Sequence, residues 1–175
     1  MTRPVGRATT IADRFRIAKP AAPGQHSAMA YEFKLQRRVE FSETDAAGIV
    51  HFSNFFRYME SAEHAFFRSL GYSVMMRHFD PPLGFPRVHV ECDFKSPLRF
   101  EDLVEIHLLV REKKSKVLSY LFRFYNLSVQ PPVEVARGIC TVVCVSHTPE
   151  GKLTSTRIPH EIANRIKVAP AELLA

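Results

Sequence analysis

The stretch from residue 41 to residue 60 reads FSETDAAGIVHFSNFFRYME and joins a short polar loop to the start of an apolar helical pattern. Asp45 and Gly48 lie in the loop, where a glycine permits backbone conformations and close approaches that other residues do not. The first turn of the helix presents unpaired backbone N–H groups at the positive end of the helix dipole. The stretch therefore predicts a short carboxylate beside N–H donors, an arrangement suited to acyl transfer.

The helix that follows is predicted to run from residue 54 to residue 70. Its apolar residues recur at helical spacing and form one stripe: Phe55, Met59, Ala62, Phe66 and Leu70. Ser53 or Asn54 is expected to cap the start of the helix. Gly71 follows Leu70 at the place where a left-handed residue ends many helices.

Alternating apolar and polar residues predict five strands around this helix. The first strand, 33–39, precedes the helix, and the other four follow it at 88–94, 104–110, 118–124 and 133–146. Short turns join the later strands, so we expect these four to form an antiparallel meander. A short helix near 160–167 is expected to close the domain. One long helix against the apolar face of such a sheet predicts an α+β fold.

The composition favours a single soluble domain. The chain has 175 residues, of which 46% are hydrophobic and 24% charged, and no apolar run reaches the roughly 18 residues of a membrane span. Its three cysteines, Cys92, Cys140 and Cys144, are too few for a disulfide framework and are expected to pack as small hydrophobes. This cysteine usage predicts a reducing compartment and a cytoplasmic protein.

Most of the positive charge lies in the first 30 residues. The formal net charge is +6, and residues 1–30 carry +4 of it, which leaves +2 for the rest of the chain. The remainder therefore offers no basic face for nucleic acid. Residues 1–30 lack an apolar period and are predicted to be a disordered basic tail, either a transit peptide or an extension preceding a start at Met29. The predicted domain is 31–168, followed by a C-terminal tail, 169–175.

The sequence TDAAGIV at residues 44–50 resembles the signature of the 4-hydroxybenzoyl-CoA thioesterase family. It is similar to Tol-Pal-associated and 1,4-dihydroxy-2-naphthoyl-CoA thioesterases, and the resemblance covers about residues 31–147. It implies the hot-dog fold, in which a five-stranded antiparallel sheet wraps one central helix. It also implies hydrolysis of an acyl-CoA to free acid and CoA, without a cofactor, by a homodimer or homotetramer with active sites at the subunit interface.

The resemblance also implies roles for individual residues. Asp45 matches the catalytic aspartate, which acts as nucleophile or general base. Phe52 matches the residue whose backbone N–H polarises the thioester carbonyl. Three loop residues that shape the substrate pocket are matched by Gly48, Ile49 and Val50, and the adjoining His51 is a candidate for contact with substrate.

Several alternatives stay open. From its loop position alone, Asp45 would more simply be a turn or helix cap. A non-catalytic protein that binds acyl-CoA or acyl carrier protein would keep the same fold, and a hot-dog dehydratase would need a histidine–acid pair that the sequence does not place. A second subgroup carries its carboxylate on the helix, which directs attention to Glu60 and Glu63.

Other candidate ligands are less specific. The histidines have no compact metal-binding spacing, so no metal site is predicted. Basic residues that could meet the CoA phosphates are Arg87, Arg99, Lys113, Lys114 and Lys116, although the charge run at 111–116 is also typical of a solvated hairpin turn. The aromatic residues of the helix could line an acyl pocket or simply fill the core, so the acyl group stays open.

Overall fold

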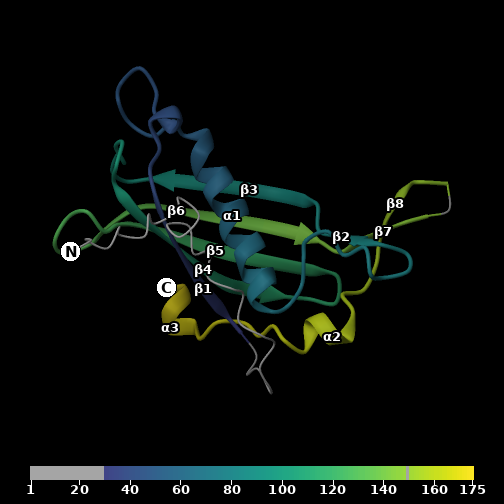
Figure 1. Ribbon diagram of the computed structural model, residues 1–175. Helices are drawn as coiled ribbons and strands as arrows, with labels where there is room; N and C mark the ends of the chain where they lie inside the picture. Colours follow the sequence, from purple (N-terminus) through teal and green to yellow (C-terminus); the bar gives the residue numbers. More distant parts are fainter. Residues whose placement is uncertain (1–29, 149) are drawn as a thin grey trace, which may run out of the picture.

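One long helix lies across a five-stranded antiparallel sheet in the computed structural model, which describes residues 30–148 and 150–175 (Figure 1). The helix is α1 (Ser53–Ser69). The sheet is ordered β1-β4-β5-β6-β3, and its strands are β1 (Glu32–Arg38), β3 (Arg87–Phe94), β4 (Leu103–Lys113), β5 (Val117–Asn126) and β6 (Val133–Val143). The predicted α+β class is confirmed. Residues 1–29 of the predicted basic tail lie outside the described residues.

The predicted meander of four strands is wrong for β3. β4, β5 and β6 follow one another, but β3 pairs with β6 at the far edge instead of with β4. Segment 95–102 crosses the end of the sheet, and there Leu98 O accepts the N–H of Val50 at 2.8 Å. Eight residues can extend over roughly 25 Å, enough to pass two strands about 5 Å apart. Alternation of apolar and polar residues predicts which face of a strand is buried. It does not predict which other strand lies beside it, so the pattern could not reveal this crossing.

The central helix follows its prediction closely except at its start. Leu70 is the C-cap, and Gly71 follows with φ +85°. The predicted side-chain cap is wrong, because Phe52 occupies the N-cap position and makes no such bond. The Asn54 amide instead donates to Glu43 O at 2.7 Å. The start of α1 is thus tied to the preceding loop by a side chain from inside the helix.

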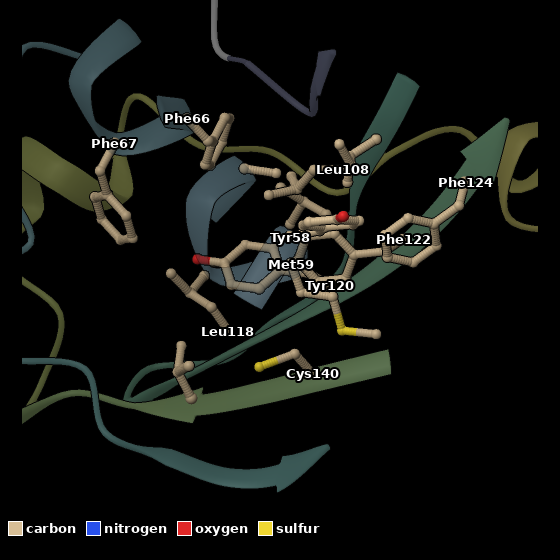
Figure 2. Packing of buried hydrophobic residues seen from close by; sticks show 14 of the residues in the cluster. Tyr58, Met59, Phe66, Phe67, Leu108, Leu118, Tyr120, Phe122, Phe124 and Cys140 are labelled. Carbon is tan, nitrogen blue, oxygen red and sulfur yellow. The ribbon is translucent and has the colours of Figure 1, made fainter. Parts of the chain in front are cut away.

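The core fills the space between α1 and the inner face of β4, β5 and β6 (Figure 2). Aromatic side chains dominate it: Tyr58, Phe66 and Phe67 from α1, and Tyr120, Phe122 and Phe124 from β5. A Cβ at Gly138 would lie 2.1 Å from Met59 Cε, so the absence of a side chain there lets α1 approach β6. Cys140 and Cys144 are buried as predicted, and Cys92 is half-buried.

A second, three-stranded sheet forms beyond the end of β6. It consists of β2 (Leu83–Gly84), β7 (Val145–His147) and β8 (Leu153–Ser155). The predicted strand 133–146 is therefore divided after Val143, because residues 145–147 pair with β2 and β8 instead of continuing beside β5. Three short helices complete the chain: η2 (Phe41–Glu43), α2 (His160–Ala163) and α3 (Ala171–Leu174). The helix predicted near 160–167 is thus a single turn.

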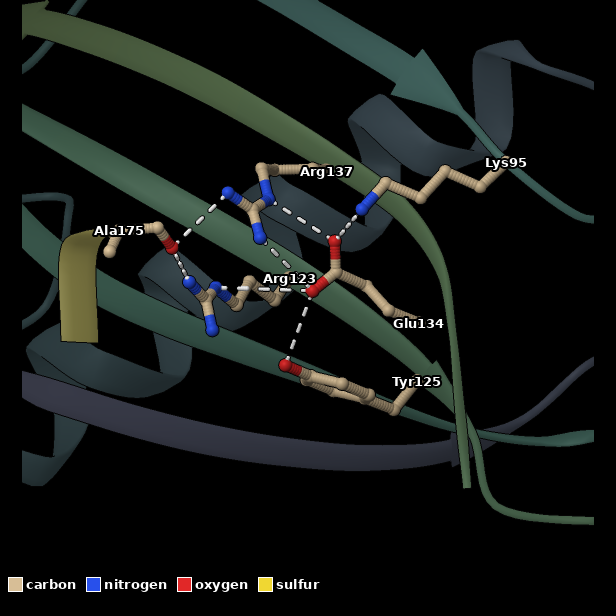
Figure 3. A network of polar contacts seen from close by, with 6 residues as sticks. All are labelled: Lys95, Arg123, Tyr125, Glu134, Arg137 and Ala175. Carbon is tan, nitrogen blue, oxygen red and sulfur yellow. Dashed lines mark hydrogen bonds and ion pairs between the residues drawn. The ribbon is translucent and has the colours of Figure 1, made fainter. Parts of the chain in front are cut away.

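Residues 169–175 pack against the outer face of the sheet. Ala169 lies with Leu109 and Leu121 in a small apolar cluster. At the chain end, Arg123 and Arg137 donate to the backbone oxygen of Ala175 (Figure 3). Burial would raise the pKa of the nearby Glu134 carboxyl, but hydrogen bonds from Arg137 and Lys95 outweigh it and lower the pKa to about 2. These contacts join the segment that we predicted to be a tail to the sheet.

Candidate active site

The loop between β1 and α1 is a tight turn built around Asp45. The N–H of Asp45 donates to Ile49 O, and the N–H of Gly48 donates to Asp45 O, both at 2.9 Å. Gly48 has φ +71°, a conformation that residues with a Cβ adopt at a cost. Thr44 and Val50 pair as an isolated bridge across the base of the turn. The DAAGIV sequence thus folds into a turn that presents the Asp45 carboxylate at its start.

Only one oxygen of the Asp45 carboxylate holds this turn. Oδ1 accepts the N–H of Ala47 at 2.8 Å and, more distantly, the N–H of Ile49 at 3.5 Å. Among the described residues, Oδ2 has no hydrogen-bond donor. The side chain is half-buried. The carboxylate therefore caps its own turn through one oxygen and leaves the other for a ligand or water.

Glu43 anchors the turn to the rest of the fold, a role that no local pattern in the sequence indicates. Its carboxylate accepts a bond from Arg37 at 2.5 Å and one from the Tyr58 hydroxyl at 2.8 Å. Its carbonyl accepts the N–H of His51 at 2.9 Å. Burial is the main cause that raises the pKa of Tyr58 above its ordinary value, and the hydrogen bond to Glu43 raises it further. Glu43 thus connects β1, the turn and α1, and fixes where Asp45 lies.

A pocket of about 420 Å³ lies beside the Asp45 carboxylate. Its lining comes from the turn, the start of α1, the end of β3 and the crossing segment: Asp45, Ile49, Val50, Phe52, Phe55, Phe94, Lys95, Ser96, Pro97 and Leu98. Four of the predicted site residues, Asp45, Ile49, Val50 and Phe52, therefore meet in one pocket. Gly48 and His51 do not line it.

Among the residues that the structure describes, one backbone N–H at the start of α1 has no acceptor. The N–H groups of Asn54 and Phe55 donate to His51 O and Phe52 O, at 2.9 and 3.2 Å. The N–H of Ser53 reaches His51 Nδ1 at 3.4 Å. Within residues 30–148 and 150–175, no acceptor contacts the N–H of Phe52. This N–H belongs to a pocket-lining residue at the positive end of the helix dipole.

His51 has a local contact outside the pocket. Its Nδ1 lies 2.8 Å from Ser53 Oγ, and its ring packs against that of Phe52 with centroids 4.5 Å apart. The imidazole is exposed. These contacts order the start of α1 and give His51 no direct position beside the Asp45 carboxylate.

A second acidic cluster lies farther along α1. Glu63 is 2% exposed, and its carboxylate accepts a bond from Arg87 at 2.6 Å. Arg87 also contacts Glu60 at 3.2 Å. Burial raises the pKa of Glu63 to about 7, against the opposing effect of Arg87. Eleven residues separate Glu63 from Phe52, about 16 Å along a helix, so this cluster does not share the Asp45 pocket.

Two other features are absent from the described part of the chain: a metal-binding cluster and a membrane-spanning helix. No cluster of three or more histidine, cysteine or acidic side chains that could hold a metal occurs there. No helix within those residues has the length and apolar character needed to cross a bilayer.

Sequence relatives of this chain include thioester hydrolases. A family model described as the thioesterase-like superfamily matches residues 39–166. A putative esterase from Aquifex aeolicus is 35% identical over 135 residues, or 77% of this chain and 98% of that protein. A 1,4-dihydroxy-2-naphthoyl-CoA hydrolase from Gloeothece citriformis is 30% identical over 110 residues, or 63% of this chain and 76% of that protein.

Solved structures show the same arrangement of helix and sheet. A gentisyl-coenzyme A thioesterase matches with a TM-score of 0.65 and 32% identity, covering 75% of this chain and 99% of that one. The 4-hydroxybenzoyl-CoA thioesterase of Pseudomonas matches with a TM-score of 0.68 and 22% identity, covering 78% of this chain and 99% of that one. The predicted hot-dog fold is confirmed by these likenesses.

Proposed function

Since the chain belongs to the thioesterase-like superfamily and is a thioester hydrolase of the hot-dog fold, we propose that it hydrolyses acyl-CoA thioesters and that Asp45 is its catalytic carboxylate. The observation that carries the proposal is the position of Asp45 in the pocket beside Phe52, with one carboxylate oxygen unbonded among the described residues. A nucleophile or base needs such an oxygen, whereas a turn cap needs only the bonded one.

The chemistry follows from the two groups in the pocket. The carboxylate of Asp45 attacks the thioester carbonyl carbon, or removes a proton from a water molecule that attacks it. The carbonyl oxygen then carries negative charge, which the N–H of Phe52 stabilises from the helix start. On the nucleophilic route the C–S bond breaks, CoA leaves as a thiolate, and the acyl group stays on Asp45 as a mixed anhydride that water hydrolyses to the free acid. On the general-base route the water oxygen forms the new C–O bond, the C–S bond breaks, and the proton taken up by Asp45 passes to the CoA thiolate. Both routes of attack need the same carboxylate.

The acyl group is proposed to be aromatic. Phe52, Phe55 and Phe94 line the pocket, and aromatic rings pack favourably edge-to-face or offset against such side chains. Two of the relatives are named as a gentisyl-coenzyme A thioesterase and a 1,4-dihydroxy-2-naphthoyl-CoA hydrolase, and both of these substrates are aromatic thioesters. An aromatic acyl-CoA is therefore the first substrate to test.

A homodimer joined through β3 would complete the site. Nothing in the described chain pairs with the outer edge of β3, and its apolar residues Val88, Val90 and Phe94 are 61%, 44% and 51% exposed. An unpaired, partly apolar edge is suited to pairing with another strand. Because Phe94 also lines the Asp45 pocket, a partner on this edge would border the site.

A second candidate function is supported by the bond from Ala47 to Asp45. If the carboxylate serves only to hold its turn, as that 2.8 Å bond allows, the protein is a non-catalytic binder of acyl-CoA or acyl carrier protein. A panel of short, long and aromatic acyl-CoAs, assayed for release of free thiol, separates the two functions. Turnover of an aromatic acyl-CoA would support the proposed hydrolase. Tight binding of an acyl-CoA without release of thiol from any member of the panel would support the non-catalytic binding protein instead.

A further inference from the structure

A single backbone carbonyl joins the Asp45 turn to the start of α1. Glu43 O accepts the N–H of His51 at 2.9 Å and the side-chain amide of Asn54 at 2.7 Å. Asn54 is 7% exposed, so its amide lies inside the protein and needs a partner there. The bond spans eleven positions of the chain, far more than the four that a bond within a helix spans. It therefore belongs to the junction between the turn and the helix.

The two bonds to Glu43 O lie on either side of Phe52 in the chain. His51 precedes Phe52 and Asn54 follows it, and the N–H of Asn54 also donates to His51 O at 2.9 Å. These bonds fix the backbone around the Phe52 N–H, which has no acceptor among the described residues. Glu43 itself lies two residues before Asp45. The N–H of Phe52 and the carboxylate of Asp45 are thus positioned from one shared atom, Glu43 O.

The side chain at position 54 serves this bond more than it serves the helix. Asparagine is a poor residue for the body of a helix, because its side chain competes for backbone hydrogen bonds. Here it is the second residue of α1, and its amide turns back to the preceding loop. A carbonyl oxygen has two lone pairs, and since the N–H of His51 takes one, the Asn54 amide takes the other. An apolar side chain of similar size would fill the space but could not make this bond.

We propose that Asn54 is a positioning residue for thioester hydrolysis, a role that rests on the proposed function. Asn54 does not line the pocket, so its amide acts through Glu43 O and the backbone at Phe52. It keeps the Phe52 N–H at the place where this group meets the carbonyl oxygen of a thioester whose carbon faces Asp45. A misplacement of about 1 Å lowers a rate by roughly 10²-fold, because both groups act on one carbonyl group in the transition state.

This role differs from that of the Glu43 carboxylate. The carboxylate bonds Arg37 and Tyr58 and ties the turn to β1 and to the body of α1. The Asn54 amide ties the turn to the residues that carry the N–H donor. Substitution of Asn54 therefore disturbs the spacing between the two reactive groups, while the bonds of the Glu43 carboxylate remain.

Steady-state hydrolysis of an aromatic acyl-CoA by Asn54→Ala, measured well below the melting temperature, tests the proposal. Turnover should fall by about 10–10²-fold with KM unchanged, since the alignment matters in the transition state and not for binding. Asn126→Ala is a matched control, because Asn126 is also 7% exposed, its amide donates to Asp102 at 3.0 Å, and it lies outside the pocket. This control should lower the melting temperature by a similar amount and change turnover by less than about twofold.

Asn54→Asp separates positioning from stability. It keeps the size of the side chain but, when ionised, has no proton to donate to Glu43 O. A carboxylate in the first turn of a helix interacts favourably with the helix dipole. We therefore expect a smaller loss of melting temperature than in Asn54→Ala and at least as large a loss of turnover. Turnover that follows melting temperature across the three variants, or full turnover in Asn54→Asp, would overturn the proposal.

Asp45→Asn, assayed beside these variants, keeps the proposal separate from the proposed function. If Asp45→Asn keeps its turnover while both Asn54 variants lose theirs, the catalytic role of Asp45 is contradicted and Asn54 still positions the Phe52 N–H. If Asp45→Asn loses its turnover while both Asn54 variants keep theirs, the proposed function stands and the positioning role of Asn54 is overturned.

Discussion

Two carboxylates of this molecule, Asp45 and Glu63, sit in opposite environments. Asp45 lies in an open turn at the start of α1 with one oxygen unbonded among the described residues, and it lines a pocket. Glu63 lies in the body of α1, is 2% exposed and bonds Arg87 at 2.6 Å. Burial and a raised pKa are common marks of functional groups, yet ion pairs in the body of a fold produce them as well. The contacts of Glu63 favour a structural role, and those of Asp45 favour a chemical one.

Removing Arg87 should give the largest loss of stability. Arg87→Ala leaves Glu63 buried and unpaired, and we expect the free energy of unfolding to fall by about 3 kcal/mol, the lower end for a buried pair because Arg87 is partly exposed. Urea denaturation measures this loss. Arg77→Ala removes an exposed arginine from the same region and should change stability by less than about 0.5 kcal/mol. Similar losses of unfolding free energy in both variants would contradict the structural role proposed for Glu63.

The pH dependence of stability should report Glu63. Its pKa is about 7 in the folded chain and 4.5 as its ordinary value. The folded state therefore binds the proton more tightly, so stability from this group is complete below pH 4.5 and is lost as the pH rises to 7. We expect a decrease on the order of 2 kcal/mol across this window. Glu63→Gln should flatten the slope, and an unchanged slope would mean that the carboxyl is not perturbed.

The anchor of the Asp45 turn should have a smaller effect. Glu43→Gln weakens the bonds to Arg37 and Tyr58, and we expect a loss of about 1–2 kcal/mol together with reduced turnover, because the turn loses its fixed position. Glu112→Gln removes the exposed pair with Lys114 and should cost less than about 1 kcal/mol. Melting curves and thiol-release assays on both variants check this, and full turnover in Glu43→Gln would show that the anchor does not position Asp45.

The smallest expected effect on stability is that of alanine at a glycine with positive φ, and two such glycines can be compared. Gly48 and Gly151 have φ of +71° and +79°, and a Cβ at either would meet nothing within 4 Å. Alanine at either position should therefore cost about 1 kcal/mol through backbone strain alone. Only Gly48→Ala should also lower turnover, because it deforms the turn that holds Asp45. Equal turnover in the two variants would show that catalysis does not depend on the shape of the Asp45 turn.

The sequence predicted local structure better than contacts between distant segments. The apolar stripe gave α1 to within a residue, and the TDAAGIV resemblance led to the pocket that Asp45 lines. The place of β3 at the sheet edge could not be predicted, because alternation does not encode the neighbour of a strand. The Glu43 contacts were missed for the same reason: they join residues from β1, the turn and α1, which no local spacing brings together.

The most direct test of the contrast between these carboxylates is the turnover number of Asp45→Asn beside that of Glu63→Gln, on the best acyl-CoA and with a melting curve for each sample. If Asp45 is nucleophile or base, Asp45→Asn should lose about 10²–10⁴-fold in turnover, keep its acyl-CoA affinity and melt near the unmodified protein. Glu63→Gln should keep turnover within about tenfold. Retained turnover in Asp45→Asn with a loss of about 1 kcal/mol in stability would instead make Asp45 a turn cap.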